Sequence, residues 1–190
     1  MKIAITGGIG SGKSYVCRLL TQQGIEIYDC DNAAKRLMRT SDAIRTSLTQ
    51  LIGPDTYNAD GTLNKAEVAR FLLQSEQNAQ AIDNIVHPAV AHDFQHSRNQ
   101  WMECAILFES GFERLVDRVI VVTAPESLRI ERIMRRDGIT REKALEWIHR
   151  QWDQERVRQL SDYEIINDGR PLEPQIKKII TSLYQNIDIP

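Results

Sequence analysis

The chain has 190 residues, enough for one main globular domain with smaller lobes. Its net charge of −2 argues against nucleic acid as the principal partner, because phosphate binding normally leaves a basic excess. No apolar run approaches the length of a membrane span, and Met1-Lys2 leads directly into a strand pattern, not a signal peptide. Cys17, Cys30 and Cys104 show no C-x-x-C spacing and are expected to be reduced, mostly buried thiols. The composition therefore predicts a soluble cytoplasmic protein without a membrane partner.

The first motif along the chain is a glycine-rich loop. An apolar run typical of a strand covers residues 2–6, and a helical pattern follows from Tyr15. Between them lies a match to G-x-x-x-x-G-K-[ST], with the sequence Gly7-Gly8-Ile9-Gly10-Ser11-Gly12-Lys13-Ser14. In this context the backbone N–H groups surround a phosphate, Lys13 reaches the β- and γ-phosphates, and Ser14 holds Mg²⁺. The motif predicts a nucleoside triphosphate site; a glycine-rich turn without a ligand is the alternative.

The second strand pattern ends in two carboxylates. Residues 25–28 are apolar, and Asp29-Cys30-Asp31 follows directly. Ligands of open α/β sheets bind at the carboxyl ends of the strands, so both carboxylates are expected beside the phosphate loop. A carboxylate there can accept a proton from an attacking hydroxyl or hold Mg²⁺ through water. The alternative is that Asp31 or Asn32 caps the next helix. The functional interpretation is favoured for Asp31 and stays open for Asp29.

A long helical segment separates the second and third strand patterns, because residues 28–104 are far more than one crossover helix needs. Gly53-Pro54 ends one helical pattern, and a turn at 58–61 precedes Asn64, an expected helix N-cap. The helical patterns cover residues 32–39, 42–52, 65–74 and 77–99.

Histidines mark the end of this segment. His87 precedes Pro88, which predicts a helix boundary, because proline disfavours the helical conformation of the residue before it. At such a turn His87 is a candidate substrate contact, with a structural role as the alternative. His92 and His96 have a spacing that can bind metal, but no third ligand is evident, and surface histidines are the preferred interpretation.

Three further strand patterns lie at 104–108, 118–123 and 163–166. The first two include continuous apolar runs, as expected for strands covered on both faces. Alternation of strands with helices predicts an α/β fold, a five-stranded parallel sheet flanked by helices. Glu109 would end the third strand at the phosphate edge. A role near Mg²⁺ or the substrate and a structural hydrogen bond are equally supported for it.

The segment at 126–160 is strongly charged. From Arg129 to Arg158 it carries nine Lys/Arg and six Asp/Glu. A solvated helix with ion pairs is the usual interpretation of such a segment. Beside a phosphate loop, however, arginines can stabilise a transferring phosphoryl group. The candidates are Arg129, Arg132, Arg135, Arg136 and Arg141.

A GTPase is poorly supported. The segment Asn64-Lys65-Ala66-Glu67 differs from N-K-x-D in its last residue and lies in the helical segment. No D-x-x-G occurs in the sequence.

Together these motifs resemble those of the dephospho-coenzyme A kinase family over the whole chain. The phosphate loop alone is shared by many kinases, whereas the order and spacing of the full set are specific. The matching positions are Thr6 to Ser14, Asp29-Cys30-Asp31, Asp60-Gly61-Thr62-Leu63, His87-Pro88, Ile106-Leu107-Phe108-Glu109, Gln151, Asp162 and Ile165-Ile166-Asn167-Asp168-Gly169. The departures from the family pattern are Tyr15, Lys35, Ala105 and Val157.

The resemblance implies a P-loop kinase fold with a helical substrate-binding insertion and a helical lid. The nucleotide-binding core would comprise residues 1–31, 101–125 and 161–190. Residues 32–100 would bind dephospho-CoA, and residues 126–160 would form the lid.

The resemblance also implies a reaction: transfer of the γ-phosphoryl group of ATP to the ribose 3′-hydroxyl of dephospho-CoA, the last step of CoA biosynthesis. ATP, with Mg²⁺, and dephospho-CoA would be the partners of a monomer or weak homo-oligomer. Catalytic roles fall to Lys13, Asp31, Arg132 and Arg136. Nucleotide-binding residues would be Gly8, Gly10, Ser11, Gly12, Lys13, Ser14, Tyr15, Asn167 and Gly169. Substrate-binding residues would be Asp31, Lys35, His87, Phe108 and Glu109. The alternatives are another P-loop kinase of a nucleoside or small metabolite, and a regulatory ATP-binding module.

Overall fold

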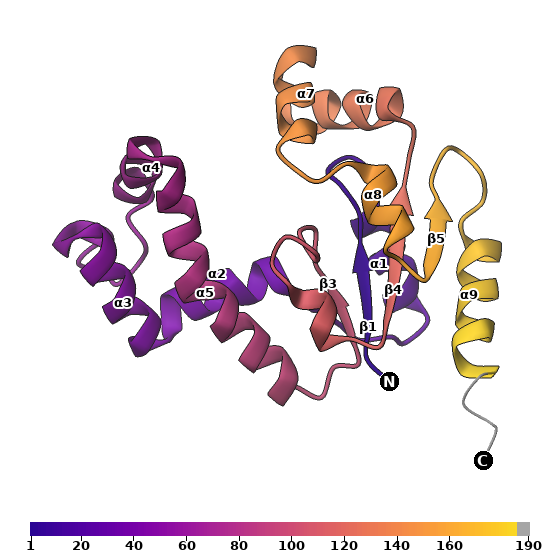
Figure 1. The fold of residues 1–190 in the computed structure, drawn as a ribbon, viewed down its shortest axis with the longest axis horizontal. Coiled ribbons are helices and arrows are strands. Elements are labelled where there is room, and N and C mark those ends of the chain that lie inside the picture. Colours follow the sequence, from indigo (N-terminus) through magenta and orange to yellow (C-terminus); the bar gives the residue numbers. More distant parts are fainter. Residues whose placement is uncertain (186–190) are drawn as a thin grey trace. The chain divides into compact units, whose positions relative to one another are not determined.

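The computed structural model describes residues 1–185. The chain forms two compact units, one comprising residues 1–28 and the chain from residue 99 onward, the other residues 29–98 (Figure 1). The first contains most of the sheet, and regular structure in the second is almost all helical. Within the described residues, no helix combines the length and apolarity needed to cross a membrane.

A five-stranded parallel sheet is the centre of the first unit, as the sequence predicts. Its strands are β1 (Ile3–Thr6), β2 (Ile27–Asp29), β3 (Trp101–Glu103), β4 (Arg118–Thr123) and β5 (Tyr163–Ile166). Their order across the sheet is β2-β3-β1-β4-β5. Ile3 lies opposite Trp101 on one side and Arg118 on the other. Because β1 is the middle strand, the glycine-rich loop that follows it leaves the centre of the sheet's carboxyl edge.

The third strand corrects the sequence prediction. It covers Trp101–Glu103 and not residues 104–108, which instead begin a series of turns. Leu107 is fully buried, and its carbonyl accepts a hydrogen bond from the Phe112 N–H at 2.9 Å. A short apolar run fits a buried turn as well as a buried strand, so its composition was misleading. Glu109 consequently does not end a strand.

One face of the sheet is covered by α1 (Lys13–Gln22) and α9 (Glu173–Gln185). Ile3 and Ile5 are two residues apart in β1 and therefore point to the same face of the sheet. Both belong to a buried cluster that includes Leu20 of α1 and Ile176 of α9. The burial of four successive residues in β1 shows that its other face is covered too. Packing on both faces therefore holds β1, the strand that leads into the glycine-rich loop, in place.

Residues 126–160 form three helices: α6 (Glu126–Asp137), α7 (Arg141–His149) and α8 (Gln154–Gln159). Helices α6 and α7 share a small core of Ile130, Ile133, Ala144 and Ile148. Ile9, from the glycine-rich loop, packs against the same core. The loop and these helices are therefore joined by apolar packing.

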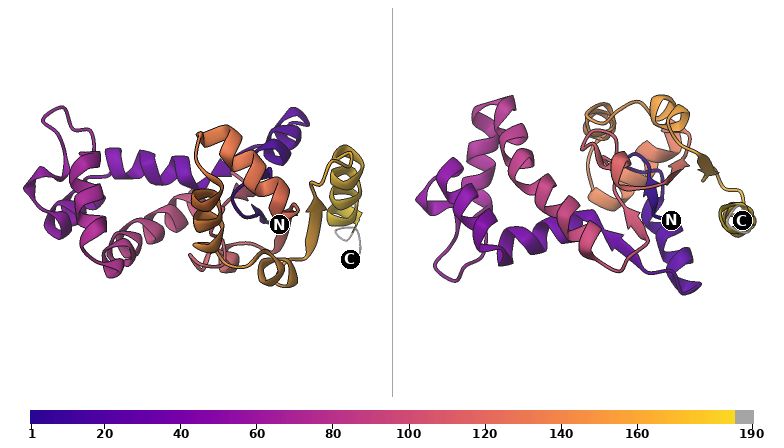
Figure 2. Two further views of the ribbon diagram at one scale, coloured as in Figure 1. Left: turned by 90° about the horizontal axis from the view of Figure 1, so that it is seen from above. Right: turned by 60° about the horizontal axis from the view of Figure 1, so that its bottom comes forward.

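The second unit contains α2 (Cys30–Thr40), α3 (Asp42–Ile52), the 3₁₀ turn η1 (Pro54–Thr56), α4 (Lys65–Gln74) and α5 (Glu76–His96) (Figure 2). Asn64 caps α4, accepting a hydrogen bond from the Glu67 N–H, as predicted. The helix boundary predicted at His87 is wrong, because α5 continues through Pro88. Buried residues four apart, at Val86 and Val90, lie on the same helix face, and α5 packs against α2 and α3. This packing outweighs the local preference of the residue before proline.

Candidate active site

Gly12 is the point at which the phosphate loop turns into α1. Its φ of 91° lies in the left-handed region that favours glycine. A Cβ atom added there would lie 2.0 Å from Nδ2 of Asn167, so the space also requires glycine. The Gly12 carbonyl accepts hydrogen bonds from the N–H groups of Tyr15 and Val16, at 3.0 and 3.2 Å, and so starts the helix.

Unsatisfied donors gather where the loop meets α1. Within the described part of the chain, the backbone N–H groups of Gly10, Gly12, Lys13 and Ser14 have no acceptor. Helix α1 has neither a side-chain cap nor an acidic residue in its first turn, so the positive end of its dipole is uncompensated. The fully buried Ser11 hydroxyl also lacks a hydrogen-bond partner among the described residues. Such a concentration of free donors at a helix N-terminus is suited to binding an anion.

Lys13 forms an ion pair with Glu103, the last residue of β3. The two side chains are only 13% and 15% exposed. The Ser14 hydroxyl donates to the same carboxylate oxygen, Oε1 of Glu103, at 3.4 Å. One carboxylate therefore gathers the two side chains that the motif assigns to phosphate and Mg²⁺.

Glu103 was missed from the sequence because the third strand was placed too late. Its signal is the apolar pair Trp101-Met102 directly before it, both buried in the structure. The second strand has the same arrangement, an apolar segment followed by Asp29. A shorter strand ending at Glu103 would have placed this carboxylate at the phosphate edge.

Arg132 and Asn167 bind carbonyl groups of the loop. Arg132 Nη1 donates to the carbonyls of Gly10 and Ser11, both at 3.2 Å, and its Nη2 donates to Oδ1 of Asn167 at 3.2 Å. Asn167 Nδ2 donates to the Ser11 carbonyl at 2.8 Å. Burial lowers the pKa of the Arg132 guanidinium, and the charge of Arg135 lowers it further, but arginine stays protonated at neutral pH. Side chains thus engage the carbonyls of Gly10 and Ser11, while the N–H groups of Gly10 and Gly12 have no acceptor among the described residues.

The remaining residues assigned to the nucleotide and the phosphates are exposed. Arg136, one turn beyond Arg132, forms an ion pair with Asp137 at 2.7 Å. Tyr15 is 45% exposed, with the Arg18 guanidinium 5.2 Å from its ring centre. Gly169 is also exposed, with nothing near the position of an added Cβ. The structure therefore brings Arg132 and Asn167 to the loop, but not Arg136.

Phe108 and Glu109 contact the segment that follows α7. The Phe108 ring is nearly parallel to that of Trp152, with centres 6.3 Å apart. Glu109 Oε1 accepts a hydrogen bond from the backbone N–H of Trp152 at 3.1 Å. The Arg156 guanidinium lies over the indole, 3.3 Å from its centre. Of the two roles considered for Glu109, the structure shows the structural hydrogen bond.

The second unit carries the other candidate residues. Asp29 caps α2, because its Oδ1 accepts from the Asn32 N–H at 2.9 Å. Asp31 and Lys35 are both exposed and four residues apart on α2, so they share one face. His87, half-buried on α5, lies 3.5 Å from Oδ1 of Asp83. The capping role considered for Asp31 or Asn32 therefore belongs to Asp29.

Comparison with known proteins identifies the family. Residues 1–173 match the family model described as dephospho-CoA kinase. The chain belongs to the dephospho-CoA kinase family. A dephospho-CoA kinase from Bacteroides fragilis (strain YCH46) is 40% identical over 98% of this chain and 95% of its own length. Another from Porphyromonas gingivalis is 41% identical over 95% of this chain and 93% of its own.

Solved structures show the same fold. TT1252 from Thermus thermophilus has a TM-score of 0.83 at 28% identity, with 97% of each chain covered. A dephospho-CoA kinase from Campylobacter jejuni has a TM-score of 0.70 at 20% identity, covering 98% of this chain and 100% of that one. A shikimate kinase from Acinetobacter baumannii has a TM-score of 0.60 at 16% identity, covering 99% and 95%. The fold is thus that of P-loop kinases, including members outside the dephospho-CoA kinase family.

Proposed function

We propose that the protein transfers the γ-phosphoryl group of ATP to the ribose 3′-hydroxyl of dephospho-CoA, forming CoA and ADP in the last step of CoA biosynthesis. Family membership supports the choice of acceptor. The observation that carries the proposal is the set of free backbone N–H groups of Gly10, Gly12, Lys13 and Ser14. Free backbone donors at a helix N-terminus favour an anion, and the phosphates of ATP would accept their hydrogen bonds.

Lys13 and Arg132 are the charged groups proposed to act on the phosphates. In this proposal Lys13 neutralises the β- and γ-phosphate oxygens. Its ammonium group would then leave Glu103, or contact Glu103 and the phosphates together. Arg132 already binds the loop carbonyls and adds its positive charge next to the loop. Asn167 and Gly169, which follow β5, are proposed to lie near the adenine of ATP.

Mg²⁺ suits the donor set at the end of β3. The Ser14 hydroxyl and the Glu103 carboxylate are oxygen donors, and Mg²⁺ commonly binds through one or two protein oxygens together with substrate phosphates. When bound, the ion would neutralise charge that develops on the phosphate oxygens. In the proposal Ser14 and Glu103 hold it, and Glu103 also keeps Lys13 beside the loop.

Asp31 is proposed to orient the 3′-hydroxyl and accept its proton. It is exposed in the first turn of α2, two residues after β2 ends, so its carboxylate is accessible to a substrate. Phosphoryl transfer has a loose transition state, so orientation of the hydroxyl matters at least as much as basicity. Lys35, His87, Phe108 and Glu109 are proposed to contact dephospho-CoA, together with the segment 32–100.

Residues 126–160 are proposed to act as the lid. Closure over both substrates would exclude water and limit hydrolysis of ATP. Arg132 is already at the loop, whereas Arg136 would have to leave Asp137 to reach a phosphate. We propose that the protein works in the cytoplasm as a monomer or weak homo-oligomer; its three cysteines are buried thiols, which suits a reducing compartment.

A panel of acceptors tests the function. The purified protein is incubated with ATP, Mg²⁺ and dephospho-CoA, a nucleoside, a nucleoside monophosphate or shikimate, and ADP release is followed by a coupled assay. The proposal expects ADP release only with dephospho-CoA, and CoA as the product by mass spectrometry. Turnover with another acceptor alone would instead favour a different P-loop kinase, and ATP binding without turnover a regulatory module.

A further inference from the structure

Ile9 of the phosphate loop is held by the lid segment in three ways. Its N–H donates to Oε1 of Gln151 at 2.7 Å, and its carbonyl accepts a hydrogen bond from Nε of Arg129 at 2.9 Å. Its side chain packs against the α6–α7 core. Both polar groups of one peptide residue are thus bound by side chains more than a hundred positions away.

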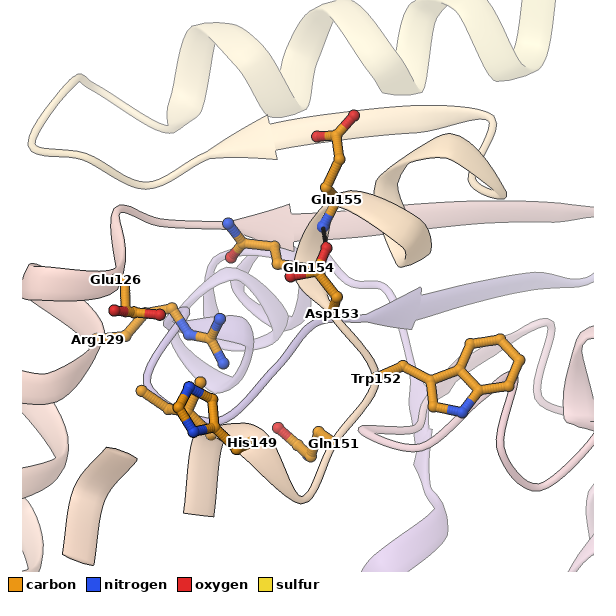
Figure 3. A pocket seen from close by; sticks show the side chains of 9 residues that line it. Glu126, Arg129, His149, Gln151, Trp152, Asp153, Gln154 and Glu155 are labelled. Carbon is orange, nitrogen blue, oxygen red and sulfur yellow. Dashed lines mark hydrogen bonds between the residues drawn. The ribbon is translucent and has the colours of Figure 1, made fainter. Parts of the chain in front are cut away.

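Arg129 and Gln151 stand at the two ends of the α6–α7 pair. Arg129 is in the first turn of α6, and Gln151 is two residues beyond the end of α7. Both side chains line a pocket of about 500 Å³. Figure 3 shows them there together with Glu126, His149 and Asp153. Arg129 and Gln151 therefore connect the start of α6 and the end of α7 to the phosphate loop.

Arg129 is a buried cation. It is only 4% exposed, and within the described residues no carboxylate oxygen lies within ion-pair distance of its guanidinium. Burial lowers its pKa, while Glu126 and Asp153 act in the opposite direction from a greater distance. The group stays charged at neutral pH. Its contact with the Ile9 carbonyl and its positive charge both favour an anion at the loop.

Gly8 leaves the space that this arrangement needs. A Cβ atom at residue 8 would lie 2.5 Å from Nη2 of Arg129 and 3.3 Å from Oε1 of Gln151. The absence of a side chain therefore lets the two lid residues reach the neighbouring Ile9 peptide.

We propose that Arg129 and Gln151 are positioning residues that set the phosphate loop in its ATP-binding shape before ATP arrives. Neither residue touches the substrate; both act through the Ile9 peptide. Prior ordering of a flexible site favours binding because less conformational freedom is lost when the ligand arrives. The inference rests on the proposed use of ATP, but not on the identity of the acceptor.

The test replaces each residue with methionine, which removes the hydrogen bond; the methionine side chain matches glutamine in length and is shorter than arginine. For Gln151→Met and Arg129→Met we expect the dissociation constant for ATP, measured by calorimetry without acceptor, to rise about tenfold, as expected for loss of a buried hydrogen bond. We expect kcat at saturating ATP to change less than about twofold, because bound phosphates restore the loop. The matched controls are Gln159→Met and Arg150→Met, both on exposed side chains of the same segment, and these should bind ATP normally.

Charge and hydrogen bonding are separated by Arg129→Lys, which keeps the positive charge without the guanidinium geometry. We expect it to recover only part of the ATP affinity lost in Arg129→Met. Full recovery would mean that charge alone matters and would overturn the positioning role of Arg129.

A measurement on the unaltered protein guards against variants that fail to fold. The Ile9 amide of the nucleotide-free protein should be protected from hydrogen exchange, and Gln151→Met should remove this protection. An unprotected Ile9 amide, or unchanged ATP affinity in both methionine variants, would overturn the proposal. Binding of ATP without phosphorylation of dephospho-CoA would overturn the proposed acceptor instead and leave the positioning role standing.

Discussion

The phosphate loop and the helical unit at 29–98 are stabilised in different ways. The loop is held by partners far along the chain: Gln151 binds Ile9, and Asn167 binds Ser11. In the helical unit the caps act over two or three residues, as when Asn64 accepts from Glu67. The conformation of the loop is therefore a property of the whole first unit, whereas the ends of these helices depend on local sequence. Substitutions in the two regions should separate nucleotide binding from stability.

The largest expected effect is on catalysis and comes from a residue of the helical unit, Asp31. It therefore runs against the simple separation of nucleotide binding from stability. Asp31→Asn should lower kcat by about 10²–10⁴, since the amide cannot accept the hydroxyl proton. The dissociation constant for ATP should stay nearly unchanged. Steady-state kinetics and calorimetry measure the two quantities. Asp42→Asn, in the first turn of the next helix, is the matched control. Near-normal turnover of Asp31→Asn would remove that residue from the proposed role.

Gly12→Ala should weaken ATP binding next most strongly. The substitution places a Cβ 2.0 Å from Asn167 Nδ2 at a φ of 91°. Backbone strain of about 1–3 kcal/mol corresponds to roughly a 5- to 150-fold rise in the dissociation constant if the loop distorts to relieve it. Gly24→Ala is the control, because Gly24 has a φ of 85° but nothing within 4 Å of an added Cβ. Equal ATP binding by the two variants would contradict the importance of the Asn167 contact.

Asn64→Ala should lower stability without altering ATP binding. Loss of the cap on α4 is expected to reduce the free energy of unfolding by about 1 kcal/mol. Urea denaturation gives the stability, and calorimetry gives the affinity for ATP. A clear change in ATP affinity would indicate that the helical unit and the phosphate loop are coupled.

The smallest effect is a pH dependence at Glu155 on α8. Hydrogen bonds from Arg158, and then from Gln159, lower the pKa of this exposed carboxyl to about 2 from an ordinary 4.5. The folded-state pKa is depressed, so the stabilisation is fully present above pH 4.5 and is lost as the pH falls from there towards 2. Glu155→Gln should therefore lower Tm slightly near neutral pH, and the difference from the unaltered protein should shrink on acidification from pH 6 to pH 3. A difference independent of pH would point to another cause.

Local signals in the sequence predicted the loop, the inner strand β1 and the cap at Asn64, because each depends on neighbouring residues. The sequence did not predict that α5 would continue through Pro88, since burial of Val86 and Val90 decides that. The role of Gln151 at the loop was missed for a related reason, because its partner Ile9 lies 142 positions away and such a pairing leaves no periodic pattern in the sequence. Glu103 was missed because the third strand was placed at 104–108 and not at Trp101–Glu103.

Trp152 gives the protein a built-in optical reporter. Its indole lies beneath the Arg156 guanidinium, and the residue directly follows Gln151, whose side chain binds the phosphate loop. A shift of that segment when nucleotide enters would change the surroundings of the indole and therefore its fluorescence. Trp101 is 3% exposed in the sheet core, which makes it a steady background emitter.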